Sequence, residues 1–280
     1  MQHQTDTAQA ISCDVRELRQ NVLAEVSRSV VGLDDVTDQL LIAMIAGGHV
    51  LMEGVPGTAK TTLCKTFAQL LGVDFHRIQF TPDLLPGDVT GTNIFDRKTN
   101  EFVLRKGPIF CQMLLADELN RAPAKTQSSL LEAMQERQVT IEGTTLPLPT
   151  PFLVLATQNP VEQEGVYRLP EAQLDRFLLK VEVGYPQRTD EISMLDIHSQ
   201  TVGEPNAITG PAAIIDLQKQ LPDVHFSDEL KSYIVDLCRE SRNHPDIALG
   251  ASPRAALYTC LLYTSPSPRD QRGSRMPSSA

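Results

Sequence analysis

The chain has 280 residues, of which 41% are hydrophobic and 21% charged, and its formal net charge is −10. That composition suits one large or two modest globular domains, and no apolar run approaches the roughly 20 residues of a membrane-spanning helix. The acidic charge argues against a large nucleic-acid footprint, because such a surface needs a basic face. Cysteines and histidines lack metal-ligand spacing and the first residues do not resemble a signal peptide, so we expect a cytoplasmic chain with reduced thiols and no structural metal.

The elements expected in chain order alternate between helices and strands. Apolar periodicity predicts a helix over residues 14–29 and a second one that follows Gly32 and ends at Gly47. Short apolar runs predict buried strands at 49–54, 74–80, 111–118, 152–160 and 178–186, with helices at 60–72 and 126–138. Turn residues between β-prone runs predict hairpins at 91–107 and 139–148. This alternation predicts an α/β fold with a parallel sheet flanked by helices, followed from about residue 187 by a helical region.

The last residues differ in character from the rest. Residues 260–280, "CLLYTSPSPRDQRGSRMPSSA", follow a predicted helix and are rich in Pro, Ser and Arg without periodicity. The parts "CLLYTSPSPRD" and "SRMPSSA" resemble the in-frame translation of a transposase-type sequencing adapter and of the primer site that follows it. We therefore expect a non-native, adapter-derived tail and a helical region that is cut short, although a natural disordered tail is the alternative.

A glycine-rich stretch, "EGVPGTAKTTL", lies between a predicted strand and a predicted helix. It nearly matches the phosphate-binding pattern G-x-x-x-x-G-K-[ST], with Ala59 in place of the second glycine. The backbone N–H groups of such a loop and the start of its helix point at an anion. Ala59 adds only a methyl group, and we expect it to be tolerated if its φ stays negative. The predicted nucleotide-binding residues are Gly54, Val55, Pro56, Gly57, Thr58, Ala59, Lys60, Thr61 and Thr62.

Polar side chains close two further apolar strands. Asp117 and Glu118 end the run "MLLADE", and Asn159 ends the run "LATQNP". The carboxyl ends of strands face the ligand crevice in open α/β sheets. Lys60 can reach the β- and γ-phosphates of ATP, and the Thr61 hydroxyl and Asp117 can hold Mg²⁺. Glu118 can deprotonate the attacking water, and the Asn159 amide can position it, whereas acids at a solvent-facing strand end are the alternative.

At these residues the chain resembles the MoxR family of AAA+ ATPases, over roughly residues 30–259. The blocks that carry the resemblance are "GVPGTAKT", "LLADELNRAPAKTQSSLLEAMQERQVT", "LATQNPVEQEGVYRLPEAQLDRFLLK" and "GASPRA". It implies an AAA+ P-loop NTPase fold in which Lys60 and Thr61 belong to Walker A and Asp117 and Glu118 to Walker B. It also implies that the two hairpins are the helix-2 insert and the pre-sensor hairpin.

The resemblance implies further roles that the residues alone do not establish. Asn159 matches sensor 1, and Arg254, in "GASPRA", matches sensor 2 on the helical lid. Arg176, in "LDRF", matches the arginine finger that reaches the ATP of a neighbouring subunit, with Arg168 as its competitor. A surface salt bridge is the alternative for Arg176, and a cation at a helix start is the alternative for Arg254.

The resulting organisation is an N-terminal helical segment (1–29), an AAA+ core (30–186), a truncated α-helical lid (187–259) and the adapter-like tail (260–280). We expect an ATPase that uses ATP and Mg²⁺ and acts as a hexameric ring that remodels partner proteins. The family implies a client such as a von Willebrand factor A-domain protein. The alternatives are a magnesium-chelatase-like motor subunit, a DNA-acting motor, which the acidic charge disfavours, and an ATP-binding scaffold with little turnover.

Overall fold

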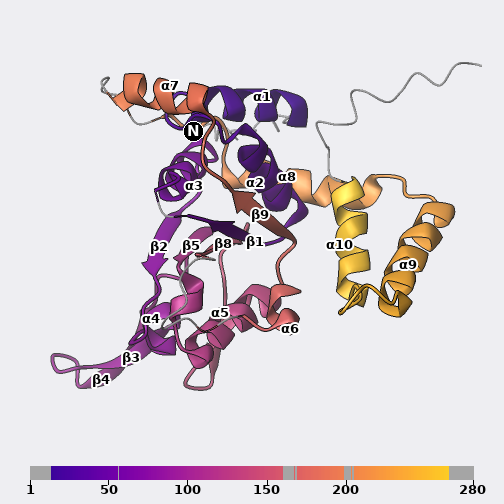
Figure 1. The fold of residues 1–280 in the computed structure, drawn as a ribbon. Coiled ribbons are helices and arrows are strands. Elements are labelled where there is room, and N and C mark those ends of the chain that lie inside the picture. The colour runs from indigo at the N-terminus through magenta and orange to yellow at the C-terminus, as the bar shows by residue number, and fades with distance from the viewer. Residues whose placement is uncertain are drawn as a thin grey trace, which may run out of the picture.

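The computed structural model of the chain describes residues 14–55, 57–159, 167, 169–198, 203 and 205–264. Its centre is a five-stranded sheet in which neighbouring strands run parallel (Figure 1). In sheet order the strands are β2 (Phe75–Gln79), β5 (Met113–Asp117), β8 (Leu153–Gln158), β1 (Val50–Gly54) and β9 (Leu179–Val183). The parallel α/β sheet predicted from the sequence is confirmed. Pro56, Arg168 and residues 265–280 lie outside the described part of the chain.

The central strands are buried on both faces, which explains why they read as unbroken apolar runs rather than as alternating ones. On β8, Leu153 and Leu155 belong to the apolar cluster on one side of the sheet, whereas Val154 and Ala156 belong to the cluster on the other side. Successive residues of a strand point to opposite faces, so the central strands β5, β8 and β1 each contribute to both clusters. The sheet is therefore held rigidly between two layers, with its carboxyl edge left for the site.

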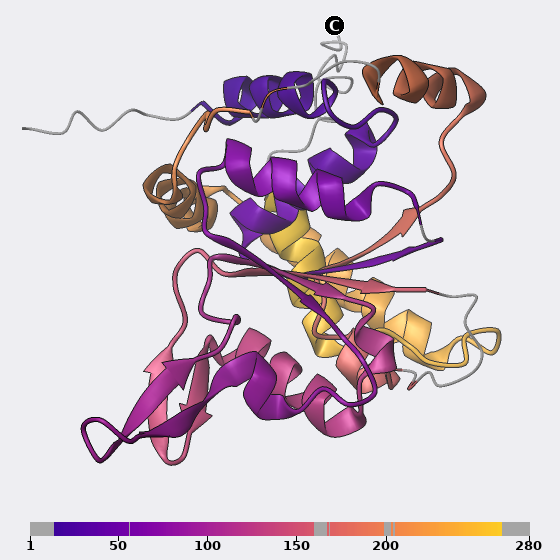
Figure 2. The same ribbon diagram turned by 90° about the vertical axis from the view of Figure 1, so that its left-hand side faces the viewer.

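One layer consists of helices that pack on the first cluster, above the sheet in Figure 2. These are α1 (Val15–Val26), α2 (Asp34–Ala46), α3 (Lys60–Leu70) and α8 (Pro211–Gln220). Helix α2 begins with two acidic residues, which favour the positive end of the helix dipole. It ends at Gly47, whose φ of 66° suits a left-handed cap that donates to the carbonyls of Ala43 and Met44. The predicted end of this helix is confirmed.

The other layer lies below the sheet and carries both predicted hairpins (Figure 2). Its helices are α4 (Pro86–Thr90), η1 (Leu119–Arg121), α5 (Ala124–Glu136) and α6 (Glu171–Leu174). The hairpins are β3 (Gly91–Asp96) with β4 (Glu101–Lys106), and β6 (Gln138–Ile141) with β7 (Thr144–Pro147). Asn93 Nδ2 donates to Glu142 Oε2 over 2.7 Å, which joins the two hairpins. The first hairpin projects from the layer and exposes Phe95 and Phe102, 49% and 72% accessible.

The C-terminal part is helical, as predicted. It comprises α7 (Arg188–His198), α8, η2 (Leu221–Asp223), α9 (Asp228–Asn243) and α10 (Pro253–Thr264). Helices α9 and α10 pack together to one side of the sheet (Figure 1). Helix α10 continues across residue 260, where the adapter-like tail was predicted to begin. Beyond that residue Leu262 packs on the core, and the ring centroids of Tyr263 and Phe226 lie 5.2 Å apart. Within the described residues, no helix is long and apolar enough to cross a membrane.

Candidate active site

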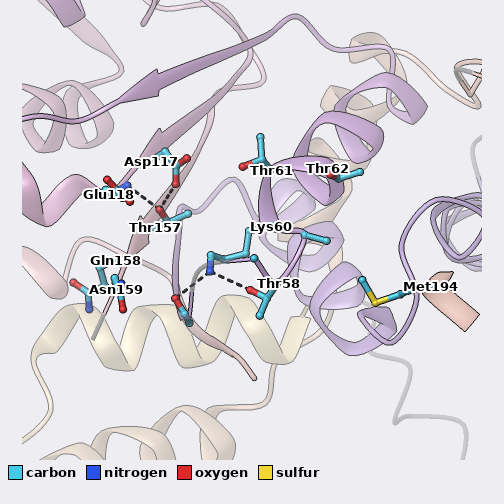
Figure 3. Close-up of a pocket in the computed structure, with 13 residues that line it drawn as sticks. Thr58, Lys60, Thr61, Thr62, Asp117, Glu118, Thr157, Gln158, Asn159 and Met194 are labelled. Carbon is cyan, nitrogen blue, oxygen red and sulfur yellow. Dashed lines mark hydrogen bonds between the residues drawn. The ribbon is translucent and has the colours of Figure 1, made fainter. Parts of the chain in front are cut away.

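Thirteen residues line a cavity of about 450 Å³ at the carboxyl edge of the sheet (Figure 3). Strand β1 ends at Gly54, the loop turns through Gly57, and α3 begins at Lys60, which is the strand–loop–helix order that the sequence predicted. Every described residue of the predicted phosphate loop except Val55 contributes to the wall. The lining residues are Gly54, Gly57, Thr58, Ala59, Lys60, Thr61, Thr62, Asp117, Glu118, Thr157, Gln158, Asn159 and Met194.

The ammonium group of Lys60 closes the loop on itself. Its Nζ donates to the carbonyls of Gly54 (3.0 Å) and Val55 (2.7 Å) and to Thr58 Oγ1 (3.1 Å). Burial lowers the pKa of Lys60 from its usual value, and the charge of Asp117 works in the opposite direction. A desolvated cation that has only carbonyl and hydroxyl partners would gain strongly from a phosphate oxygen, so the loop is suited to hold an anion.

Ala59 corrects one expectation. Its φ and ψ are 55° and 18°, so it adopts the left-handed conformation, not the negative φ on which its tolerance was predicted to depend. This conformation costs a residue with a Cβ roughly 1–2 kcal/mol, which a glycine avoids. The chain accepts the cost because Ala59 must turn the backbone into α3, where its carbonyl accepts from Leu63 N at 2.9 Å. The loop therefore has the backbone shape of the glycine pattern without the glycine.

The two acids stand on the opposite wall and are held by a threonine that the sequence reasoning missed. Thr157, on β8 beside β5, donates from Oγ1 to Asp117 Oδ1 over 2.6 Å. The same oxygen accepts from Glu118 N at 2.8 Å. Thr157 itself is 2% accessible, and its two hydrogen bonds fix the direction of the acid pair at the cavity wall. Its position two residues before Asn159, on the same side of one strand, is the signal that could have identified it.

Basic and amide side chains from β2 and η1 also hold the acids. Arg77 forms an ion pair with Asp117 Oδ2 at 2.7 Å. Glu118 Oε2 accepts from Gln79 Nε2 at 2.6 Å and from Arg121 at 2.9 Å. Glu118 itself adopts a left-handed conformation with φ 56°, which marks backbone strain at the site. None of these partners was predicted; for Arg77 and Gln79 the reason is that β2 is adjacent to β5 only in the folded sheet.

The comparisons with known proteins agree with this geometry. A family model of the ATPase family associated with various cellular activities (AAA) matches residues 49–179. YeaC of Bacillus subtilis (strain 168) is 46% identical over 246 residues, which cover 87% of this chain and 77% of that protein. Chaperone MoxR1 of Mycobacterium tuberculosis is 44% identical over 259 residues, 89% of this chain and 68% of that protein. The chain belongs to the MoxR family of AAA ATPases.

A solved structure supports the same fold for this MoxR-family chain. A crystal structure described as that of an ATPase from Cytophaga hutchinsonii has a TM-score of 0.81 and 44% sequence identity. The match covers 89% of this chain and 79% of that one. The family resemblance and the fold class expected from the sequence are thus confirmed.

The MoxR-family fold keeps the two remaining predicted site residues, Arg176 and Arg254, away from the phosphate-loop cavity. Arg176 donates to the carbonyl of Leu131 over 2.8 Å, and Arg254 forms an ion pair with Asp175 at 3.5 Å. Both line a different cavity of about 260 Å³, which shares no lining residue with the first. Asn159, by contrast, lies in the first cavity beside the acids, as predicted (Figure 3).

Proposed function

We propose that this chain hydrolyses ATP with the help of Mg²⁺. One observation carries the proposal: the phosphate loop, Lys60, the Asp117–Glu118 pair and Asn159 converge on a single cavity of about 450 Å³. The AAA ATPase family to which the chain belongs supports the same activity. A cavity of this size with a desolvated cation on one wall and two carboxylates on the other matches the needs of phosphoryl transfer, which depends on positioning and charge.

The residues present fit a magnesium ion that is held together with a nucleotide. Asp117 and Thr61 both line the cavity, whereas the described residues contain no cluster of three or more His, Cys, Asp or Glu that could hold a metal alone. Protein sites for Mg²⁺ commonly provide one or two oxygen ligands and leave the rest to water and phosphate. When bound, the ion would neutralise charge on the phosphates, while Asp117 stays oriented by Thr157.

Each remaining side chain then has one task. Lys60 moves from the loop carbonyls to the phosphate oxygens. Glu118 takes a proton from the water whose oxygen attacks the terminal phosphorus, and ADP leaves with the electrons of the bond that breaks. Asn159, at the end of β8, orients that water. Gln79 and Arg121 hold the Glu118 carboxylate in position before this step.

We further propose that hydrolysis requires a ring, with six copies as the arrangement that the family implies. Arg176 lies outside the phosphate-loop cavity of its own chain and would reach the nucleotide of a neighbour. Arg254 shares the cavity of Arg176, so we assign it to the same face rather than to the nucleotide of its own chain. Repeated head-to-tail contacts of this kind form a closed ring when the rotation from one copy to the next adds up to a full turn.

What ATP hydrolysis would drive is proposed from the exposed side chains of one hairpin and from the name of the relative Chaperone MoxR1. The exposed ring pair Phe95–Phe102, with centroids 5.3 Å apart, stands on a hairpin that projects from the core (Figure 1). Exposed aromatic side chains on a projecting element suit contact with other proteins. We therefore propose chaperone-like remodelling of partner proteins, of which a von Willebrand factor A-domain protein is one candidate.

The experiment compares two substitutions at constant protein concentration. Glu118→Gln should bind ATP with nearly native affinity and lose turnover by roughly 100-fold or more, since the general base is removed. Lys60→Ala should lose both binding and turnover. The readouts are binding of a fluorescent ATP analogue and phosphate release. Native turnover in Glu118→Gln would reject the mechanism. If the unsubstituted chain binds ATP but releases no measurable phosphate, the alternative of an ATP-binding scaffold with little turnover is favoured.

A further inference from the structure

Three arginines, not two, line the cavity away from the phosphate loop. Arg137 joins Arg176 and Arg254 there, and no carboxylate is among the described residues that line it. Asp175 reaches Arg254 at 3.5 Å from outside the wall, and in the part of the chain that the structure describes no carboxylate lies within ion-pair distance of Arg137. Glu132 and Glu136 line the adjacent cavity, which shares only Gln135 and Arg176 with this one. The cavity thus has a clear positive excess.

The position of Arg137 is unusual in two ways. It caps α5 in a left-handed conformation with φ 52°, a strain that non-glycine residues rarely accept. Its guanidinium donates to the carbonyl of Gly47, at the end of α2, and partial burial lowers the pKa of Arg137 from its usual value. A helix-capping contact alone does not require three guanidinium groups around one cavity of about 260 Å³, where like charges repel.

The two cavities of the chain are complementary in charge. Among the described residues that line the phosphate-loop cavity, Lys60 is the one cation, and it stands opposite two carboxylates. Even with the proposed Mg²⁺, a nucleoside triphosphate in this cavity would meet a single cationic side chain of its own chain among these lining residues. The arginine cavity provides three guanidinium groups and no acid, which suits a multiply charged anion better than the single charge of a carboxylate.

We propose that Arg137 is a third anion-contacting arginine of the face that Arg176 and Arg254 form, and that it meets the phosphates of the nucleotide bound to a neighbouring copy. The inference rests on the proposed ATPase ring and adds a residue to it. The α5 cap aims the side chain, and α10 closes the cavity opposite it with Leu257, Tyr258 and Leu261. Tyr258 helps to hold the backbone of Arg176 in place, since its hydroxyl donates to the carbonyl of Arg176 at 3.3 Å.

A mixing experiment tests whether Arg137 acts on a neighbour. Arg137→Gln should lower phosphate release by about 10- to 100-fold, in line with the loss of one charge-stabilising donor. Arg137→Gln is then mixed in equal amounts with Lys60→Ala, which is inactive but keeps Arg137. In a randomly mixed ring, up to about a quarter of all sites would combine an intact Lys60 with a neighbouring intact Arg137, so the rate should rise well above the sum of the two proteins.

The controls separate this inference from the proposal beneath it. Arg176→Ala mixed with Lys60→Ala should show the same rescue, and Arg97→Gln, on the exposed hairpin, should keep the native rate. Rescue with Arg176→Ala but not with Arg137→Gln would overturn the role of Arg137 and leave the ring intact. Absence of rescue with both would overturn the ring arrangement itself.

A purely structural role for Arg137 predicts a different result. Arg137→Gln would then melt at a lower temperature, while its rate per folded protein would stay native and mixing would add nothing; this outcome rejects the inference. Arg137→Lys keeps the charge and should retain more than about a third of the native rate if the anion contact matters. It also provides the readout if Arg137→Gln fails to fold, because Arg137→Lys can be melted and assayed with and without Lys60→Ala.

Discussion

A drop in pH should destabilise this fold through one histidine. His49 is 5% accessible, and its Nδ1 accepts from Val154 N at 3.0 Å, so Nε2 carries the proton that it donates to the carbonyl of Met134 at 3.1 Å. The neutral ring therefore joins β1, β8 and α5. Burial, with a smaller effect from the charge of Arg137, lowers the pKa of His49 to about 4. Protonation would also place a donor at Nδ1 opposite the Val154 N–H.

The sign follows from the two states of the chain. An unfolded histidine takes up its proton near pH 6.5, whereas folded His49 does so near 4, so between these values the unfolded state binds more protons. The stability that the neutral ring confers is therefore fully present above pH 6.5 and is lost as the pH falls towards 4. The difference in pKa corresponds to a loss of about 3 kcal/mol of unfolding free energy in total, of which about 2 kcal/mol is lost by pH 5. Most carboxylates titrate below pH 5, so the effect of the histidine can be separated from theirs.

The assay is urea unfolding between pH 7.5 and 5, in the native chain and in His49→Gln. The native chain should lose about 2 kcal/mol over this interval from this residue, and His49→Gln, although less stable at pH 7.5, should lack that part of the slope. His244→Gln is the matched control, because it removes an exposed histidine that lies outside the sheet and its two layers. An equal slope in the native chain and His49→Gln would refute the reasoning.

Two further substitutions probe the site. Thr157→Val should lower kcat roughly tenfold or more and destabilise the fold by about 1–3 kcal/mol, because it frees Asp117 and leaves the Glu118 N–H without its acceptor; Thr157→Ser should restore most of both. Steady-state kinetics with thermal melts measure this, and a native kcat in Thr157→Val would exclude the orienting role. Ala59→Gly should retain turnover and change the free energy of unfolding by no more than about 1 kcal/mol, since relief of the left-handed strain offsets the entropy of glycine. A loss of turnover in Ala59→Gly would mean that the methyl group itself contributes to the site.

The fold was predictable because its signals are local. Buried parallel strands read as short apolar runs, and turn residues marked both hairpins. The end of the second helix at Gly47 was predictable because glycine readily adopts the left-handed conformation that ends a helix. The phosphate loop and the acids could be found from the sequence for the same reason. The loop directly follows one predicted strand and precedes a predicted helix, and the acids directly end another predicted strand. The φ of Ala59 was predicted wrongly, because the loop closure overrides the preference of the residue.

The rest of the site could not be predicted, since its contacts join strands that are distant in sequence. Arg77 and Gln79 reach Asp117 and Glu118 only because β2 is the neighbour of β5 in the sheet. Thr157 acts across the β5–β8 pair in the same way. A sequence pattern identifies a residue type at the end of a strand, but the order of strands decides which side chains meet it.

If the proposed ring mechanism holds, the distribution of charge within one chain makes a single copy a poor catalyst. The cavity that holds Lys60 also holds Asp117 and Glu118, so the described lining offers a nucleotide two negative side chains and one positive side chain from its own chain. The compensating guanidinium groups lie in a second cavity, which α5 and α10 build on another part of the surface. In the proposed ring, this separation into two surfaces means that a neighbouring copy supplies the arginines, so turnover would depend on assembly.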